Sequence, residues 1–385
     1  MHSKNNKQEN MNICILTSHY YPKTGGVEHI TQQLAEGLAE RNHNVCVLAA
    51  LDGCSRSSSY NGVKIVRFDV CLKRGFPAGQ KDEIQKYLLD CSDNFDVFVC
   101  VCIDAAIVLS AIPVIDKIKG KKILYMHGIQ QFKPSDLFQK WGIYRLFYTI
   151  RIHYILKYFE YVLKSFDASI HLFQNDSSHA YFQNHGIEKN YILNNFSDDL
   201  FFEENQSCSE LPYIVYVANY LPLKNQEILL RAVYLTNHVK KTIFIGSEET
   251  KYYHFLSGLK LKLDRKHGWH DIDFLTCLSR RKMAEIVKNA YLFVMTSKSE
   301  MFPVVLTEAM AAGIPFISTD TGIVKKLPGG IITQAKPDKI ATVIDELYIN
   351  DKKYSEMKAA AKKYADKNLR RSVYLDRFEE IMRNC

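Results

Sequence analysis

Two glutamates with seven residues between them, Glu300 and Glu308, bracket a segment whose residue types favour binding of an anion. Pro303 opens a helical stretch of small and apolar residues that ends near Gly313, and both residues are typical of helix boundaries. The backbone amides of residues 301–304 then point out of the helix start, where they can bind a phosphate. Because carboxylates repel a phosphate, we expect the two glutamates to accept hydrogen bonds from hydroxyl groups on either side of it. A sugar nucleotide carries hydroxyls, phosphates and hydroxyls in this order.

Each glutamate also has a purely structural interpretation. Glu300 could cap the helix, since a negative charge is favoured at a helix N-terminus, and Glu308 could lie on a solvated helix face. The two carboxylates, the helix start and the small-residue run 309–313 nevertheless occur together after a predicted strand. This combination favours a binding site.

The elements that must position these residues follow an α/β pattern, in which short apolar runs alternate with amphipathic helical stretches. We expect strands at 12–17, 44–49, 63–68, 97–102, 122–126, 168–172, 213–217, 242–245, 272–275, 292–295 and 316–318. Turn-forming and polar residues at 191–211 separate two domains. We place a disordered lead-in at 1–10, an N-terminal domain at 11–200, a C-terminal domain at 201–365, and a C-terminal helix at 366–385 that can pack back on the N-terminal domain.

The composition is that of a globular protein with an affinity for anions. Its 385 residues are too many for one ordinary core, and a formal net charge of +8 attracts nucleotides, nucleic acids or anionic membranes. Without a zinc-finger or RNA-binding signature, nucleic acid is the weakest of these partners. Neither a bilayer-spanning apolar run nor a secretory signal is present, so we expect a cytoplasmic protein. The ten cysteines are scattered and predict no metal site.

Around the two glutamates the chain resembles the family 4 glycosyltransferases, whose pattern is a glutamate, seven residues, a second glutamate and Ala-Met-Ala-x-Gly-x-Pro. The matching positions are Glu300, Glu308, 309–311, Gly313 and Pro315. The resemblance implies that the Glu300 region contacts the donor sugar and that Glu308 binds the nucleotide ribose. Met301 replaces a usual glycine, so the sugar pocket can differ in shape. The donor-binding residues of this segment are then Met301, Phe302, Pro303, Val304 and Glu308.

The resemblance also assigns a role to the loop at 218–225. Lys224 matches a lysine that neutralises the donor diphosphate, because the leaving group gains negative charge as the glycosidic bond breaks. Asn219 stands where an arginine is usual, so this clamp has one cation fewer. An ordinary surface lysine is the alternative interpretation of Lys224.

Three further matches lie outside these two segments. Gly25 and Gly26 form a turn that, in the family, lies across the cleft from the donor phosphates, although a paired glycine can serve turn geometry alone. His127 matches a histidine that contacts donor sugar or acceptor, and with a pKa near neutral it could assist proton movement; a satisfied turn histidine is the alternative. Leu278 aligns with a residue that packs against the nucleobase.

As a whole, the resemblance implies the GT-B architecture, with two Rossmann-like domains that face each other across a cleft. The donor is then held mainly by the C-terminal domain and the acceptor mainly by the N-terminal domain. It further implies retaining transfer without a metal or other cofactor, in which the donor phosphate accepts the acceptor proton. We expect Glu300 and His127 to be catalytic, Glu300 through positioning and charge stabilisation rather than as a nucleophile.

Residues 132–165 combine many aromatic side chains with six basic and two acidic residues. This combination suits a helix that lies on anionic lipid and brings the enzyme to a lipid-linked acceptor. A helix pair with its aromatic side chains in the core of the N-terminal domain is an equal alternative, because the aromatic residues do not keep to one helical face.

The expected activity is transfer of a hexose or N-acetylhexosamine from a UDP sugar, or else a GDP sugar, to a glycan or lipid-linked acceptor in cell-envelope polysaccharide synthesis. Such an enzyme would be cytoplasmic and peripheral on the inner face of the membrane. A sugar-nucleotide epimerase of the same architecture is one alternative, but it would lack the Ala-Met-Ala-x-Gly-x-Pro match. A non-catalytic nucleotide-sugar-binding subunit is another, and Asn219 favours it.

Overall fold

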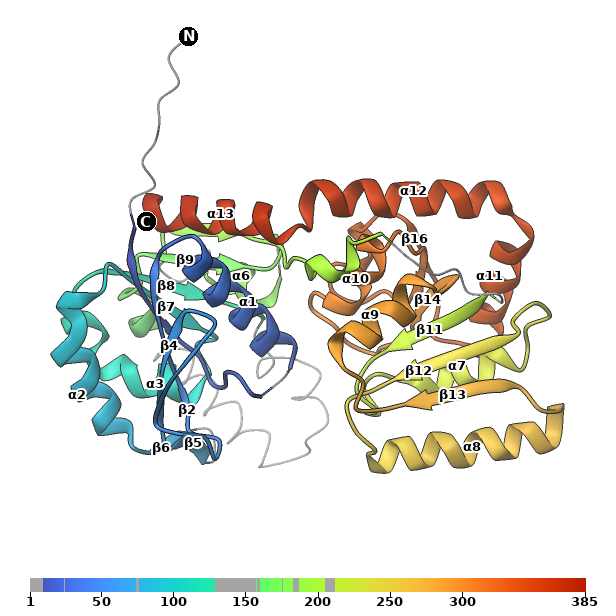
Figure 1. The fold of residues 1–385 in the computed structure, drawn as a ribbon, viewed down its shortest axis with the longest axis horizontal. Coiled ribbons are helices and arrows are strands. Elements are labelled where there is room, and N and C mark those ends of the chain that lie inside the picture. The colour runs from blue at the N-terminus through green and yellow to red at the C-terminus, as the bar shows by residue number, and fades with distance from the viewer. Residues whose placement is uncertain are drawn as a thin grey trace, which may run out of the picture. The chain divides into compact units, whose positions relative to one another are not determined.

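The chain forms two compact units in the computed structural model, which describes residues 10–23, 25–73, 76–128, 157, 160–174, 176–182, 187–204 and 212–385 (Figure 1). The first unit contains the chain up to Asn194 together with Leu375–Cys385, and the second unit contains Asn195–Tyr374. Almost all of the expected lead-in at 1–10 and most of the aromatic segment at 132–165 lie outside the described residues.

The first unit is built on an eight-stranded sheet in which all neighbouring strands are parallel except β3 and β4. In sheet order the strands are β10 (Lys189–Ile192), β9 (Ala168–His171), β8 (Lys121–Tyr125), β7 (Val97–Val101), β1 (Asn12–Leu16), β2 (Asn44–Ala50), β4 (Val63–Phe68) and β3 (Ser57–Tyr60). A separate antiparallel pair, β5 (Val70–Lys73) and β6 (Phe76–Gly79), follows β4. All five residues of β7 are buried, as is typical of a parallel strand covered on both faces.

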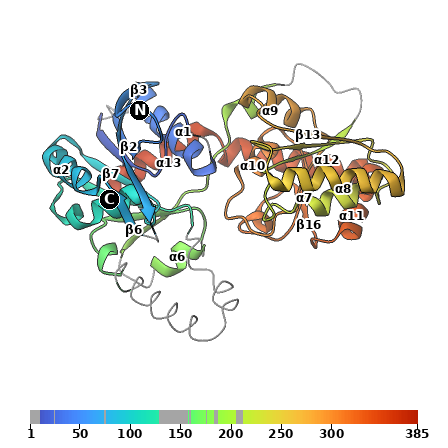
Figure 2. The same cartoon turned by 90° about the horizontal axis from the view of Figure 1, so that it is seen from below.

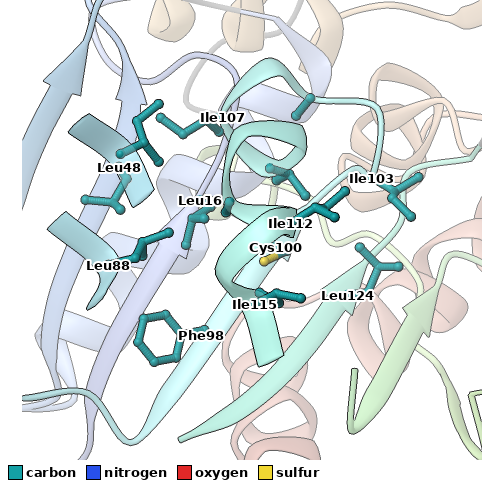
Figure 3. Packing of buried hydrophobic residues seen from close by; sticks show 14 of the residues in the cluster. Leu16, Leu48, Leu88, Phe98, Cys100, Ile103, Ile107, Ile112, Ile115 and Leu124 are labelled. Carbon is teal, nitrogen blue, oxygen red and sulfur yellow. The ribbon is translucent and has the colours of Figure 1, made fainter. Parts of the chain in front are cut away.

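Helices cover this sheet on both faces. They are α1 (Gly26–Glu40), α2 (Lys81–Cys91), α3 (Ala106–Ala111), α6 (Ser177–Phe182) and α13 (Arg371–Asn384), with short 3₁₀ helices η1 (Ser92–Asn94) and η2 (Ile112–Lys117). On one face, Leu88 of α2 joins Leu48 and Phe98 of the sheet in a single buried apolar cluster (Figure 3). This cluster also contains Ile107 of α3 and Ile115 of η2.

The C-terminal helix α13 packs on the opposite face of the same sheet. Leu124 belongs to the cluster of Figure 3, whereas its neighbour Tyr125 contacts Phe378 of α13, with ring centroids 6.0 Å apart. Successive residues of a strand point to opposite faces, so α13 and α2 lie on different sides. Farther along α13, the buried Glu379 accepts a hydrogen bond from Arg41 of 3.3 Å. The end of the chain is therefore an integral part of the first unit.

The second unit is built on a six-stranded parallel sheet with the order β13, β12, β11, β14, β15, β16. Its strands are β11 (Tyr213–Val217), β12 (Lys241–Ile245), β13 (Asp271–Leu275), β14 (Leu292–Met295), β15 (Phe316–Ser318) and β16 (Gly330–Ile332). Its helices are α7 (Gln226–Val233), α8 (Lys251–His267), α9 (Arg280–Lys288), α10 (Val304–Ala311), α11 (Pro337–Ile349) and α12 (Asp351–Asn368), with η4 (Asp199–Phe201) and η5 (Val324–Lys326) as 3₁₀ helices. α8 runs along the outside of this unit (Figure 1 and Figure 2).

The strand order of the second sheet reverses between β11 and β14. From β11 the chain continues through β12 to β13 on one side, and from β14 through β15 to β16 on the other. In open α/β sheets, ligands bind at the carboxyl ends of the strands where the order reverses. The loops that follow β11 and β14 are therefore the place to look for a site.

Every strand expected from the sequence is present, with ends that agree to within one residue. The structure adds β3, β5, β6, β10 and β16, which are short and carry few buried apolar residues. The helix expected to open at Pro303 begins at Val304, with Pro303 as its N-cap. Among the helices of the described residues, none is long and apolar enough to span a bilayer.

We predict that Glu379→Ala lowers the free energy of unfolding of the first unit by about 3 kcal/mol, because it removes a buried carboxylate that binds both Arg41 and His43. Glu379 is 4% exposed and lies 3.3 Å from both Arg41 Nη1 and His43 Nε2. Hydrogen exchange of the β8 amides in urea reports this unit separately from the second. Asp376→Ala is the matched control, since Asp376 also pairs with Arg41 but is 69% exposed. Its effect should stay within about 1 kcal/mol, and equal effects of the two changes would contradict the prediction.

Candidate functional site

Hydrogen bonds join two loops at the carboxyl edge of the second sheet. One loop follows β11 and leads to α7, and the other follows β14 and leads to α10. The Tyr216 hydroxyl lies 2.6 Å from the Lys224 carbonyl oxygen and 2.9 Å from the Ser297 hydroxyl. The amide of Lys298 donates a 2.8 Å hydrogen bond to the Leu223 carbonyl. Since β11 and β14 are parallel neighbours, these loops lie side by side at the reversal of strand order.

An ion pair between Lys224 and Glu300 links the same two loops. Lys224 Nζ lies 2.8 Å from Glu300 Oε1, and the two side chains are 24% and 13% exposed. The structure thus brings together two residues that the sequence analysis assigned to one site. Asn219 is exposed at the start of the first loop, where its carbonyl accepts a hydrogen bond from Gln226 Nε2 of 3.0 Å. The position at which the family resemblance leads us to expect an arginine is thus occupied by an exposed amide side chain.

The start of α10 retains hydrogen-bond donors. Pro303 is the N-cap and its side chain makes no cap hydrogen bond. Within the described residues, the amides of Val304 and Val305 donate no hydrogen bond to another backbone group, whereas the Leu306 amide donates to the Pro303 carbonyl. Free amides and the positive end of the helix dipole favour a bound anion here. The Phe302 side chain is buried, so it supports this turn from inside.

A glycine in the loop after β15 fixes the backbone beside this helix start. Gly322 has a φ of +53°, and a Cβ at this position would lie 2.7 Å from the Glu300 carbonyl oxygen and 2.1 Å from that of Met301. The next amide, of Ile323, donates a 3.2 Å hydrogen bond to the Met301 carbonyl. Only glycine combines this backbone conformation with so close an approach. Gly322 therefore determines where the Glu300 backbone lies.

The second glutamate, Glu308, is held by a cation that the sequence analysis did not identify. Glu308 is 2% exposed, and both of its carboxylate oxygens accept hydrogen bonds from Arg280, at the start of α9. Arg280 Nε also donates to Asp198 Oδ2 at 3.2 Å, and the guanidinium lies 5.0 Å from the centre of the Phe201 ring. Burial raises the pKa of the Glu308 carboxyl, and the Arg280 guanidinium opposes this shift. A carboxylate accepts about four hydrogen bonds, so Glu308 keeps acceptor positions that Arg280 does not use.

A cavity of about 650 Å³ lies beside the second loop. Its lining comes from the segments that follow three adjacent strands: Ser297 and Lys298 after β14, Thr319, Asp320 and Thr321 after β15, and Thr333 and Gln334 after β16. Its lining thus includes hydroxyl, amide and charged groups. Such a lining offers both donors and acceptors to a ligand with many hydroxyl groups.

The remaining predicted residue of the second unit, Leu278, lies in the loop that follows β13 and is partly buried. Ser279 follows it and caps α9, accepting a hydrogen bond from the Lys282 amide. Leu278 is thus two residues from Arg280, at the same edge of the sheet as Lys224 and Glu300.

Gly25, Gly26 and His127 lie in the first unit, also at the carboxyl edge of its sheet. Gly25 is the N-cap of α1 in an extended conformation, and α1 begins at Gly26. Neither glycine has a positive φ, so backbone strain does not explain them. A Cβ at Gly26 would meet no atom within 4 Å, and the backbone there is open to approach. Together these features match a helix start that a ligand can reach.

His127 follows β8, and its environment keeps it uncharged. Its ring centroid lies 4.4 Å from that of Tyr125, and among the described residues its buried Nε2 has no hydrogen-bond partner. Burial lowers the pKa of His127 from 6.5 to about 4, because the imidazolium loses its hydration. The sequence-based expectation of a pKa near neutral therefore differs from the structure. His127 is suited to hydrogen bonding as a neutral imidazole.

A second group that sequence reasoning missed lies at the same edge of the first sheet. His19 Nδ1 lies 2.6 Å from Asp52 Oδ2, and Lys23 Nζ lies 3.1 Å from Asp52 Oδ1. His19 and Lys23 follow β1 whereas Asp52 follows β2, so Asp52 is far from the other two residues in the sequence and their spacing does not predict the cluster. In the part of the chain that the structure describes, no group of three or more His, Cys, Asp or Glu is arranged to hold a metal ion.

Comparison with known sequences points to one family. Residues 197–364 match the family model described as glycosyl transferases group 1. An uncharacterized glycosyltransferase of Methanocaldococcus jannaschii is 31% identical over 141 residues, which is 35% of this chain and 35% of that relative. The match therefore spans about a third of the relative's length.

Solved structures of similar fold cover nearly the whole chain. A sucrose-phosphate synthase from Thermosynechococcus elongatus aligns with a TM-score of 0.76 and 13% identity, over 97% of this chain and 99% of that one. HepE of Anabaena in complex with UDP aligns with a TM-score of 0.75 and 16% identity, over 97% of this chain and 100% of that one. WaaG, a glycosyltransferase involved in lipopolysaccharide biosynthesis, aligns with a TM-score of 0.68 and 17% identity, over 96% of this chain and 99% of that one. These likenesses confirm the GT-B fold that the sequence resemblance implied.

We predict that Gly322→Ala lowers the free energy of unfolding of the second unit by about 2 kcal/mol or more, since it adds strain at a positive φ and a clash with two carbonyl groups. Urea denaturation with hydrogen exchange of β14 amides measures the change. Gly258→Ala in α8 is the control, because a Cβ there meets no atom within 4 Å. That change should stabilise by about 0.5–1 kcal/mol, and a similar loss in both variants would refute the role of Gly322.

We predict that His127 titrates with a midpoint near 4, well below its ordinary value of 6.5. The unfolded chain takes up this proton before the folded chain does. His127 should therefore make the free energy of unfolding fall as the pH is lowered from 6.5 towards 4. NMR titration of the imidazole, assigned with a His127→Gln variant, gives the midpoint. A midpoint near 6.5 would show that the ring is hydrated.

Proposed function

We propose that this chain, which has the GT-B fold and matches the glycosyl transferases group 1 family model over residues 197–364, moves a hexose or an N-acetylhexosamine from a nucleotide diphosphate sugar to an acceptor. The observation that carries the proposal is the Lys224–Glu300 ion pair beside the free amides of α10. A cation, helix amides and a carboxylate in one place match the diphosphate of such a donor and the adjoining sugar hydroxyls.

UDP is the nucleotide that we favour, with GDP as the alternative. The support is the fold shared with Anabaena HepE, which was solved with UDP and with UDP-glucose. Leu278 would then contact the nucleobase, and Glu308, held in place by Arg280, would accept hydrogen bonds from the ribose. The cavity beside Ser297 offers room and polar groups for the sugar.

The proposed chemistry rests on charge stabilisation at the diphosphate. The bond between the sugar carbon and the diphosphate oxygen breaks while the acceptor oxygen bonds to the same face of that carbon, and the acceptor proton passes to the diphosphate. Lys224 and the amides at the start of α10 would stabilise the negative charge that develops on the leaving group. An ammonium has three N–H donors, so Lys224 can hold Glu300 and a phosphate at once. Glu300 would orient the sugar through its hydroxyls.

We propose that this transfer needs no metal ion. In this account the positive charge at the diphosphate comes from Lys224 and from the helix dipole of α10. Asn219 could add a hydrogen bond from its exposed amide but no charge.

We propose that the first unit holds the acceptor, a glycan or a lipid-linked sugar of a cell-envelope polysaccharide, at the cytoplasmic face of the membrane. The open backbone at Gly26 and the neutral imidazole of His127 are the features that support this assignment. A neutral histidine can donate a hydrogen bond to an acceptor hydroxyl or accept one from it. The role of WaaG in lipopolysaccharide biosynthesis, on a similar fold, supports an envelope product.

A panel of UDP, GDP and ADP sugars tests the proposed reaction. We expect the purified protein to bind one of them and to release nucleoside diphosphate only when an acceptor is added. Rearrangement of the sugar without an acceptor would indicate an epimerase. Binding with neither reaction would indicate a non-catalytic subunit, and binding of none of the donors would remove the basis of the proposal.

We predict that Lys224→Met lowers kcat/KM for the donor about 100-fold, because one group that stabilises the leaving diphosphate is lost. Initial rates of nucleoside diphosphate release measure the effect. Lys240→Met is the control, since Lys240 is an exposed lysine next to the opposite edge of the same sheet. Lys240→Met should leave the rate unchanged, and a Lys224→Met enzyme with the rate of the wild type would contradict the assignment.

A further inference from the structure

The outward side of α8 combines unpaired cations with exposed apolar side chains. The helix links β12 to β13, and its buried residues are Leu256, Leu259 and Leu263. Seven of its eight exposed residues, all but His267, form together with the first exposed side chain after its end what we name the α8 outer face: Lys251, His254, Phe255, Leu261, Lys262, Arg265, Lys266 and Trp269. The helix that carries this face runs along the outside of the second unit (Figure 1 and Figure 2).

The positive charge of the α8 outer face is not neutralised. Asp264 is the only acidic residue of the helix, and it pairs with Lys260 at 2.7 Å and accepts a hydrogen bond from the hydroxyl of Tyr234, the C-cap residue of α7. Of the cations on the outer face, none forms an ion pair with any carboxylate among the described residues. Within its own residues the face therefore carries four cations and no anion, and the exposed Glu248 and Glu249 lie before the helix start, near Lys251 in the chain.

Three large apolar side chains lie among these cations. Trp269 is 75% exposed, Leu261 is 58% exposed and Phe255 is 46% exposed. Phe255 lies seven residues before Lys262, so the two share one side of the helix. Gly268, with a φ of +94°, ends the helix and places Trp269 directly after it. Scattered apolar residues are ordinary on a surface, but their combination with unpaired cations on one helix face is a recognition pattern.

We infer that the α8 outer face docks on the surface of an anionic lipid bilayer. Lys262, Arg265 and Lys266 would lie at the lipid phosphates, since basic side chains next to an anionic leaflet each add to binding. Trp269 would sit at the headgroup level, where its amphipathic ring is favoured, and Leu261 would enter the acyl boundary. A nucleic acid would use the same cations but would leave Leu261 in water.

This surface is separate from the segment at 132–165 for which the sequence also suggests lipid contact. It belongs to the second unit, and its described side chains carry the inference without any reference to the transfer reaction. If the α8 outer face did not bind lipid, the proposed transfer reaction would be unaffected, and the reverse also holds, because vesicle binding and donor turnover are measured independently.

The two tryptophans of the chain, Trp141 and Trp269, allow a direct test. A Trp141→Phe variant keeps Trp269 as the single indole reporter, and a Trp269→Phe variant keeps Trp141. Both full-length proteins are mixed with vesicles of phosphatidylcholine alone or with added phosphatidylglycerol. We expect the emission of Trp269 to shift to the blue only with the anionic vesicles, and the effect to weaken as salt is added. Binding with a shift of Trp141 alone, or no binding, would overturn the inference.

Charge reversal supplies a second measurement. The triple variant Lys262→Glu, Arg265→Glu, Lys266→Glu should bind anionic vesicles at least about 100-fold more weakly in sedimentation assays. The control triple, Lys352→Glu, Lys363→Glu, Lys367→Glu, changes the net charge equally on exposed positions of α12. Equal losses in both triples would show a non-specific charge effect and would overturn the assignment of α8. A Trp269 shift with RNA or duplex DNA in place of vesicles would do the same.

Discussion

The site depends on a constraint of the backbone, the parallel pairing of β11 with β14 where the strand order reverses. This pairing places the loop that carries Lys224 beside the loop that carries Glu300, although the two residues are 76 positions apart in the chain. The Tyr216 ring is buried beneath both loops, and burial raises the pKa of its hydroxyl, which therefore stays protonated and bonded to Ser297 and to the backbone of Lys224. The ion pair of Lys224 and Glu300 thus joins two loops that the buried Tyr216 holds in place.

The distribution of charge decides which cation can serve an anionic ligand. Among the described residues, Arg280 forms ion pairs with two carboxylates, those of Glu308 and Asp198, whereas Lys224 forms an ion pair with one, that of Glu300. More of the positive charge of Lys224 is therefore available to a diphosphate, whereas Arg280 orients the buried Glu308 and opposes the rise in its carboxyl pKa that burial causes. In the proposed account the diphosphate is therefore bound by one cation, Lys224, and by the amides of α10, and Asn219 adds no charge.

The sequence predicted the parts of this arrangement that depend on local pattern. Buried parallel strands such as β7 are continuous apolar runs, and the Glu300–Glu308 spacing with Gly313 after the helix identifies α10. Strand β3, which reads Ser-Ser-Ser-Tyr, shows no such pattern because its partner β4 supplies the pairing. Arg280 and Gly322 were missed for a similar reason. Their importance comes from close approach to Glu308 and Met301, which only the folded chain creates.

The central claim is that the Lys224 ammonium and the start of α10 hold the phosphates of the donor. A crystal structure of the protein with UDP measures this directly. The account predicts a phosphate oxygen within hydrogen-bonding distance of both Lys224 Nζ and the Val304 amide, with the ribose hydroxyls turned towards Glu308. UDP bound elsewhere, with Lys224 still contacting Glu300 and no phosphate, would contradict it.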